Sequence, residues 1–390
     1  MRIYSLDDEE RIRAQAQVRA WGRAKLLDSQ QSAKLEAELR VEVRRTNGLL
    51  RAGLALFTAI VVIASVFLIG VVLEVRSDVA LAFTAAAAAV ACYSAAEYLV
   101  RALRLYRHGV EEALAAFSVL LASFSALFAV VELVGRGSNA AKIASLAVGC
   151  AGGFGIYRRF GYVYALVGAA ACAMLIPFQF EAGEAPQRLM AFAILSVIFA
   201  VAGARRLECG EELPGDDYAT LQAASLAGAY LILNLHIWDV WGPFAPDAHV
   251  ARLFYWITYG AIWIIPVAGL RLGIRQRDRE MIDVSIVLAL ATLATNKPYL
   301  GWPRREWDPM ILGVLLMAGA IALRRWLARG QGGERGGFTP AQILATDAQA
   351  LSMLATASTT FHPHTASPGP APGSDFHGGR SGGGGGGGSF

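Results

Sequence analysis

Long apolar runs, separated by short polar clusters, make up most of the chain after residue 48. A helix needs roughly 20 consecutive apolar residues to cross a bilayer, and these runs approach or exceed that length. The pattern therefore predicts an all-α fold, a polytopic membrane bundle of about ten transmembrane helices. We expect the spans near residues 49–73, 79–100, 113–134, 140–157, 160–178, 189–204, 219–237, 253–271, 282–297 and 309–328. The fourth, sixth and ninth runs are short, so nine to eleven spans remain open, with a re-entrant pair as the alternative.

The first 48 residues have a different pattern, because charged residues interrupt them throughout. Asp28 and Gln31 have the spacing of a capping box, which predicts that a helix begins after Asp28. From there an apolar stripe predicts an amphipathic helix of about four turns. The stripe consists of Leu35, Leu39 and Val43. Trp21 and the leucines that follow it are expected to pack on this stripe, so residues 1–48 are interpreted as a small helical head.

The end of the chain is rich in Gly, Ser, Thr and Pro and finishes in a glycine run. A segment of this composition buries too little apolar surface to offset its conformational entropy, and is expected to be disordered. The sequence thus predicts three parts: a head (1–48), a transmembrane bundle (49–328) and a disordered tail (329–390).

Basic residues are distributed unevenly over the predicted loops. With ten spans, 27 of the 35 Lys and Arg residues lie on the side of the head and tail. The excess of Lys and Arg marks the cytoplasmic side of a membrane protein. We therefore expect a multi-pass protein of the bacterial inner (plasma) membrane with cytoplasmic N- and C-termini and the lipid bilayer as its main partner. No signal peptide is expected, since the first 48 residues contain no apolar segment of that type.

Composition narrows the classes of function. Charged residues make up 17% of the chain and the net charge is +4, without a basic patch interleaved with aromatics, so a nucleic-acid partner is not expected. The four cysteines have no CxxC spacing, which argues against a disulfide framework and a zinc site. No cofactor is expected.

The segment W-G-R-A-K-L-L-D-S-Q-Q-S-A-K-L, from Trp21 to Leu35, resembles the N-terminal head of bacterial membrane proteins of the "domain of unknown function 2157" type. In that family a helix with a Trp, a short break and an acid-capped helix precede many apolar spans. The resemblance covers under a tenth of the chain. It implies a bacterial inner-membrane protein and carries no activity with it.

Two ionisable residues within a predicted span are candidates for function. Glu97 lies late in the second span, and Arg101 follows four residues later, on the same helix face. Intramembrane charges often serve ion or proton coupling. The structural alternative is an ion pair that reaches toward the membrane interface at the end of a helix.

The second candidate site lies at the predicted outer ends of the later spans. His236 and Asp239 are three residues apart, and His249, Arg252 and Lys297 come from neighbouring segments. Together they would form a pocket for a ligand or a lipid headgroup. Two histidines and a carboxylate can also bind a metal, but the spacing matches no zinc motif, so no metal is assigned. The alternative is an interfacial belt of Trp and Tyr with polar residues beside it.

No run of residues matches a catalytic motif such as a Walker A loop or HExxH in a supportive context. Enzymatic activity is therefore open, with the balance against it. Three classes remain: a transporter of a small solute, a sensor or scaffold whose head (1–48) binds a cytoplasmic protein, and an enzyme acting on a lipid-linked substrate at the outer face through His236 and Asp239.

Overall fold

The computed structural model describes residues 2–23, 27–41, 43, 44, 46–209, 213–237, 251–302 and 307–330. Within these ranges the ordered elements are helical, which confirms the all-α prediction. Two helices belong to the head, α1 (Leu6–Arg23) and α2 (Ser29–Glu38). The predicted disordered tail lies almost wholly outside the described residues, so its state stays a prediction.

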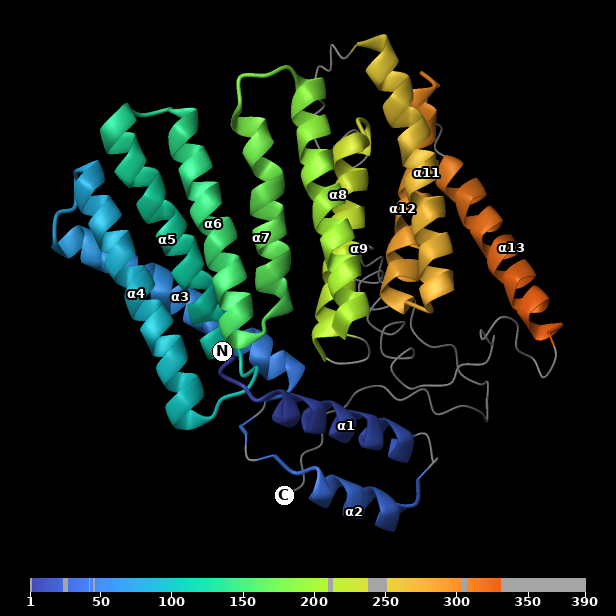
Figure 1. Cartoon of the computed structure of the whole chain (residues 1–390), viewed down its shortest axis with the longest axis horizontal. Helices are drawn as coiled ribbons and strands as arrows, with labels where there is room; N and C mark the ends of the chain where they lie inside the picture. Colours follow the sequence, from blue (N-terminus) through green and yellow to red (C-terminus); the bar gives the residue numbers. More distant parts are fainter. Residues whose placement is uncertain are drawn as a thin grey trace, which may run out of the picture.

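The remaining helices stand side by side in a bundle (Figure 1). They are α3 (Gly48–Val72), α4 (Asp78–Leu103), α5 (Val110–Val134), α6 (Asn139–Phe160), α7 (Val163–Leu175) with the short 3-10 turn η1 (Ile176–Gln179), α8 (Glu184–Cys209), α9 (Leu213–Leu233), α11 (Arg252–Gln276), α12 (Arg279–Tyr299) and α13 (Asp308–Ala328). Each coincides with one of the predicted apolar runs. We call the end of the bundle on which α1 lies the head end.

Six of these helices are long and apolar enough to cross a membrane: α3, α4, α5, α6, α8 and α11. The protein is therefore built as a multi-pass membrane protein. Helix α7 with η1 is a shorter apolar element, and the described parts of α9, α12 and α13 fall outside the set of six. Length and composition alone thus leave the predicted number of ten spans unconfirmed.

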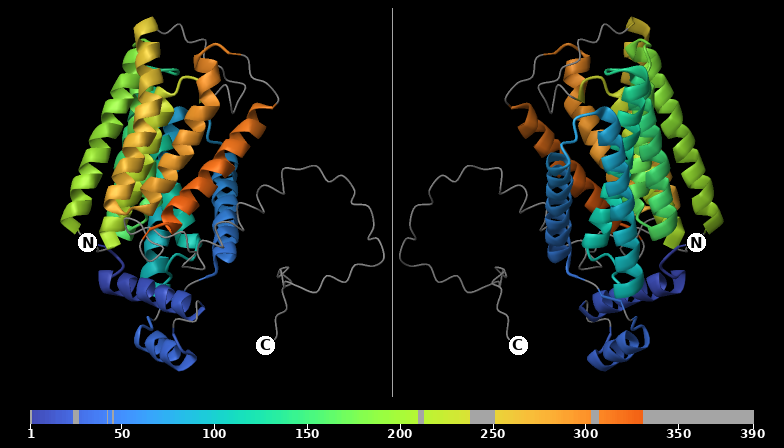
Figure 2. Two further views of the ribbon diagram at one scale, coloured as in Figure 1. Left: turned by 90° about the vertical axis from the view of Figure 1, so that its right-hand side faces the viewer. Right: turned by 90° about the vertical axis from the view of Figure 1, so that its left-hand side faces the viewer.

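Large apolar side chains cover the outside of the bundle, most densely on α3. Only 11% of the most apolar window of α3 is buried, and Phe57, Phe67 and Leu56 are among its exposed side chains. Contiguous apolar surface of this extent is costly in water and is suited to contact with lipid. Figure 2 shows α3 and the steeply inclined α13 from the sides of the bundle.

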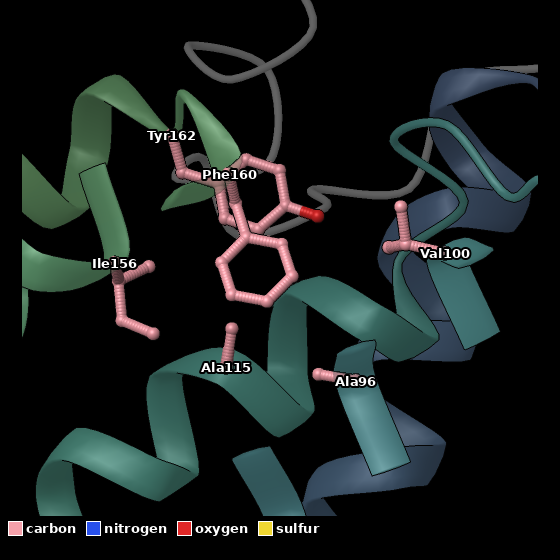
Figure 3. Packing of buried hydrophobic residues seen from close by; sticks show 6 residues of the cluster. All are labelled: Ala96, Val100, Ala115, Ile156, Phe160 and Tyr162. Atoms are coloured by element: carbon pink, nitrogen blue, oxygen red, sulfur yellow. The ribbon is translucent and has the colours of Figure 1, made fainter. Parts of the chain in front are cut away.

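Small residues bring α4, α5 and α6 close together near the head end. Ala96 and Ala115 are fully buried, and the rings of Phe160 and Tyr162 stack at a centroid distance of 5.5 Å. Figure 3 shows the Phe160 ring between Ile156 on one side and Ala96 on the other, with Ala115 facing its edge. Alanine at such contacts lets helix backbones approach without leaving voids.

The head lies across the end of the bundle (Figures 1 and 2). Asp28 accepts a hydrogen bond from the Ser29 amide, and the Gln31 side chain accepts one from the Asp28 amide, which confirms the predicted capping box. The expected length of four turns is wrong, because α2 ends at Glu38. The chain then leaves the helix and pairs its backbone with the connection between α4 and α5.

That pairing explains why the helix does not continue to Val43. The Arg44 amide donates to the Arg104 carbonyl at 3.1 Å, and the Tyr106 amide donates to the Arg44 carbonyl at 3.1 Å. An extended segment can make these bonds, whereas a helix would use the same groups internally. The predicted apolar stripe therefore begins in helix α2, with Leu35, and ends in the extended segment, with Val43.

Candidate functional site at the head–bundle interface

The predicted outer cluster is only partly within the described residues, because Asp239 and His249 lie outside them. His236 follows α9, and its Nε2 atom is 3.1 Å from the hydroxyl of Tyr255. Its ring packs edge-on against Tyr299 at 4.6 Å. Arg252 is exposed at the start of α11, and Lys297 is half-buried in the last turn of α12. His236 thus lies in an aromatic contact, as the belt interpretation expects.

Beside His236 a buried polar network joins α9, α11 and α12. Asn234 donates to the Tyr230 hydroxyl at 2.9 Å and to the Thr295 hydroxyl at 3.0 Å. The Thr292 hydroxyl donates to the Ile262 carbonyl on α11 at 2.8 Å. These side chains are fully buried, and hydrogen bonds between helices of this type hold membrane bundles together.

Glu97 has two cationic partners and not only the one that the sequence indicated. Its Oε1 atom is 2.6 Å from Arg101 on the same helix and 2.5 Å from Arg159 at the end of α6. The carboxylate therefore connects α4 to α6 at the head end. This geometry is that of a structural ion-pair cluster, while a coupling role for Glu97 stays a prediction.

The largest concentration of polar contacts lies where the head meets the bundle. Arg2 binds Glu9 of α1 at 3.2 Å and Asp217 of α9 at 3.0 Å. Asp217 also accepts a hydrogen bond from the Tyr157 hydroxyl at 3.2 Å, and the Arg2 guanidinium lies over the Tyr157 ring. One arginine thus joins the start of the chain to α1, α6 and α9.

Neighbouring contacts fix the first residues further. The Ile3 amide donates to the Arg159 carbonyl at 2.8 Å, and the Tyr4 hydroxyl donates to the Leu105 carbonyl at 2.9 Å. The Tyr4 hydroxyl is also 3.5 Å from that of Tyr162. The head is therefore attached to the connections α4–α5 and α6–α7 as well as to α9.

Burial at this interface shifts the pKa of two groups in the head. The side chain of Glu9 is 6% exposed, and this burial raises its pKa above the ordinary value of 4.5 although Arg2 opposes the shift. Burial likewise raises the pKa of the Tyr4 phenol. Burial and the contact with Arg2 both act on Glu9 in the docked head, so the charge of this carboxyl group depends on how the head is docked.

No metal-binding group of three or more His, Cys, Asp or Glu side chains occurs in the part of the chain that the structure describes. No protein-family model, curated protein or solved structure matches this chain. The function must therefore be inferred from the geometry of the interface.

No pattern in the sequence predicts this interface, because its residues are of ordinary types. Arg2 is one of many arginines in the head, and Asp217 lies in a short polar stretch before an apolar run. Their partnership spans 215 positions, so no local spacing reveals it. The one feature of the sequence that indicates such a contact is the acidic start of α9, which can pair with the basic residues of the head.

Proposed function

We propose that the chain is a bacterial inner-membrane sensor or scaffold of about ten spans, whose head presents a helical surface to a cytoplasmic protein. The observation that carries this proposal is that the residues before α1 contact α6, α9 and the α4–α5 connection, while α2 lies on the side of α1 away from the bundle (Figure 1). Helix α2 has no buried residue. A preformed, outward-facing helix is suited to partner binding, because less conformational entropy is lost on association than with an unfolded segment.

Orientation is part of the same proposal. The head end collects the helix ends and connections that contain Arg104, Arg158, Arg206 and Arg277, and the opposite end has fewer basic residues. The excess of basic residues supports a cytoplasmic head end. The ten helices at the ten predicted runs support ten spans, with α7, α9, α12 and α13 crossing in addition to the six long apolar helices. The resemblance of the head to the family named above supports the same assignment.

Trp21 offers a candidate anchor for the partner. Its side chain is 41% exposed near the end of α1, the helix that packs against α2. Exposed tryptophans often dominate the energetics of protein interfaces. In-cell photo-crosslinking at Trp21 and at Gln30 of the full chain tests this role. We expect a discrete adduct at both positions and none at Trp256 of α11, which has comparable exposure.

A transporter of a small solute is the second candidate, favoured by the buried network around Asn234. Polar side chains inside a membrane bundle often mark solute or ion pathways. The polar cavities at the head end are lined by other residues, which favours the head end over this network as the place of function. Solute uptake into proteoliposomes that the Asn234→Ala variant abolishes would favour transport over the scaffold. The enzyme hypothesis built on His236 and Asp239 stays a prediction.

A further inference from the structure

A cavity of about 390 Å³ lies at the head end, between α1, the segment before α3 and the α4–α5 connection. Three arginines line it, Arg13, Arg51 and Arg107, together with one carboxylate, that of Glu9. Its size falls in the range of small-ligand sites, which begins at roughly 300 Å³. The excess of positive charge selects for an anion.

The three arginines differ in how far the protein already neutralises them. Arg51 forms a bidentate pair with Glu112, with contacts of 2.6 and 2.5 Å. Arg13 pairs at 2.6 Å with Asp216, whose side chain is 60% exposed. Solvent screens such an exposed pair strongly, so Arg13 keeps much of its attraction for a further anion.

Arg107 differs from the other two in forming no ion pair within the described part of the chain, although the Glu9 carboxylate of the same cavity attracts it. Its guanidinium lies 5.6 Å from the centre of the Tyr106 ring. Its backbone has a φ of +49°, a left-handed conformation that is uncommon for residues other than glycine. Such backbone strain persists where the surroundings hold a side chain in a required place.

The neighbouring backbone makes this arrangement tight. Gly109 has a φ of +105°, and a Cβ atom there would lie 2.2 Å from the Arg51 carbonyl oxygen. Only glycine allows the α4–α5 connection to approach the first turn of α3 this closely. Because the two segments approach so closely, Arg51 and Arg107 line the same cavity.

The first turn of α3 adds hydrogen-bond donors to the same wall. Gly48 lines the cavity, and the Asn47 side chain makes no capping hydrogen bond to this helix. The first amide groups of a helix attract anions through their free N–H groups and the helix dipole. Guanidinium forks beside such amides match the oxygens of a phosphate.

The apolar surface next to the cavity indicates where the phosphate comes from. Leu49 and Leu50 follow Gly48 directly and are 92% and 55% exposed. They begin the exposed apolar side of α3, which acyl chains can cover. Basic pockets between helices on the cytoplasmic side recognise the headgroups of anionic lipids.

We propose that this cavity binds a phosphate group, with an anionic phospholipid of the surrounding leaflet as the favoured source and a free phosphate as the other. The inference deepens the proposed function, on which it rests for the side of the membrane. Bound phosphate would neutralise Arg107 and Arg13 together and fasten α1 to α3. The head would then report the anionic lipid content of the membrane.

The test uses the purified full chain in neutral detergent. Its melting temperature is followed while phosphatidylglycerol, phosphatidylcholine or inorganic phosphate is added, because a ligand that binds the folded state stabilises it. We expect a saturable rise with phosphatidylglycerol and none with phosphatidylcholine. Arg107→Gln and Arg13→Gln should each raise the midpoint concentration about tenfold, the effect of one lost charge-assisted contact.

The matched control is Arg158→Gln, which removes the same charge from the head end. Arg158 lies over the Phe154 ring at 5.9 Å, much as Arg107 lies over Tyr106, but it is outside the cavity. A saturable rise with inorganic phosphate that depends on Arg107 would support the site with a soluble source. Equal responses of Arg107→Gln, Arg13→Gln and Arg158→Gln overturn the proposal, because the attraction would then be non-specific.

The two proposals can fail separately. Lipid binding in detergent requires neither a protein partner nor a particular orientation, whereas the crosslinking test requires both. If Arg107→Gln does not fold, the exposed Arg13→Gln decides the outcome, since its substitution on the surface of α1 leaves the buried core intact.

Discussion

The guanidinium of Arg2 contacts the carboxylate of Asp217 at 3.0 Å, although 215 positions of the chain separate the two residues. Both side chains are largely buried, at 18% and 13% exposure. The contact makes the beginning of the chain part of the bundle's end and holds α1 against α9. The head is therefore a docked unit and not a free extension.

Removal of this arginine should weaken the whole protein. In Arg2→Gln the carboxylates of Asp217 and Glu9 lose a charged hydrogen-bond donor while staying buried, which costs about 2 kcal/mol of unfolding free energy. Denaturation of the full chain in detergent measures this loss. Arg19→Gln is the control, because its pair with Glu36 is 3.5 Å long and half exposed and should contribute less than about 1 kcal/mol. Equal losses in both variants would contradict the account.

The stability of the docked head should depend on pH through Glu9. Burial raises the pKa of this carboxyl group in the folded protein above 4.5. Between 4.5 and the folded pKa the folded state binds more protons than the unfolded state, so stability falls as the pH rises through that window. Glu9→Gln removes the contribution of Glu9 and should make the pH profile of unfolding shallower in that window. Glu38→Gln, on the exposed α2, should leave the profile unchanged.

The polar network between α9, α11 and α12 should contribute to stability. Thr292→Val keeps the shape of the side chain but removes its bond to the Ile262 carbonyl, at a cost of about 1 kcal/mol. Thr84→Val is matched to it, since the Thr84 hydroxyl bonds only within its own helix, to the Ala80 carbonyl. A larger loss in Thr84→Val, measured by unfolding in detergent, would argue that the network adds nothing.

The capping box allows a local test of the head. Asp28→Ala removes the N-cap of α2 and should destabilise that helix by about 1 kcal/mol. Hydrogen exchange should accelerate in α2 while α3 to α6 stay protected. Gln30→Ala, an exposed substitution in the same first turn, should leave the exchange unchanged.

Local patterns predicted local structure well. The apolar runs give the positions of the bundle helices, and the spacing of Asp28 and Gln31 gives the start of α2. The end of α2 could not be predicted, because it depends on the backbone pairing of Arg44 with residues near position 105. Long-range partners are invisible to periodicity, since they depend on how the chain returns to the same place.

The candidate sites were likewise predictable where the partners are close in sequence, and not where they come from different helices. The pair of Glu97 and Arg101 follows from helical spacing, whereas the second partner, Arg159, comes from another helix. The sequence indicates a site at His236 because Asp239 is three residues away. The described partners of His236 are instead Tyr255 and Tyr299, from α11 and α12. The cavity with Arg13, Arg51 and Arg107 unites three segments that no motif connects.

The central claim is that the head and the head end of a ten-span bundle face the cytoplasm. Single cysteines placed in the full chain, with the native cysteines replaced, test it through labelling by a membrane-impermeant maleimide. We predict that Gln30→Cys, Arg104→Cys and Arg275→Cys are labelled only after the inner membrane is permeabilised. Arg76→Cys and Gly183→Cys should be labelled in spheroplasts with an intact membrane. Labelling of Arg104→Cys and Arg275→Cys from opposite sides would contradict the ten-span arrangement, and labelling of Gln30→Cys in intact spheroplasts would contradict a cytoplasmic head.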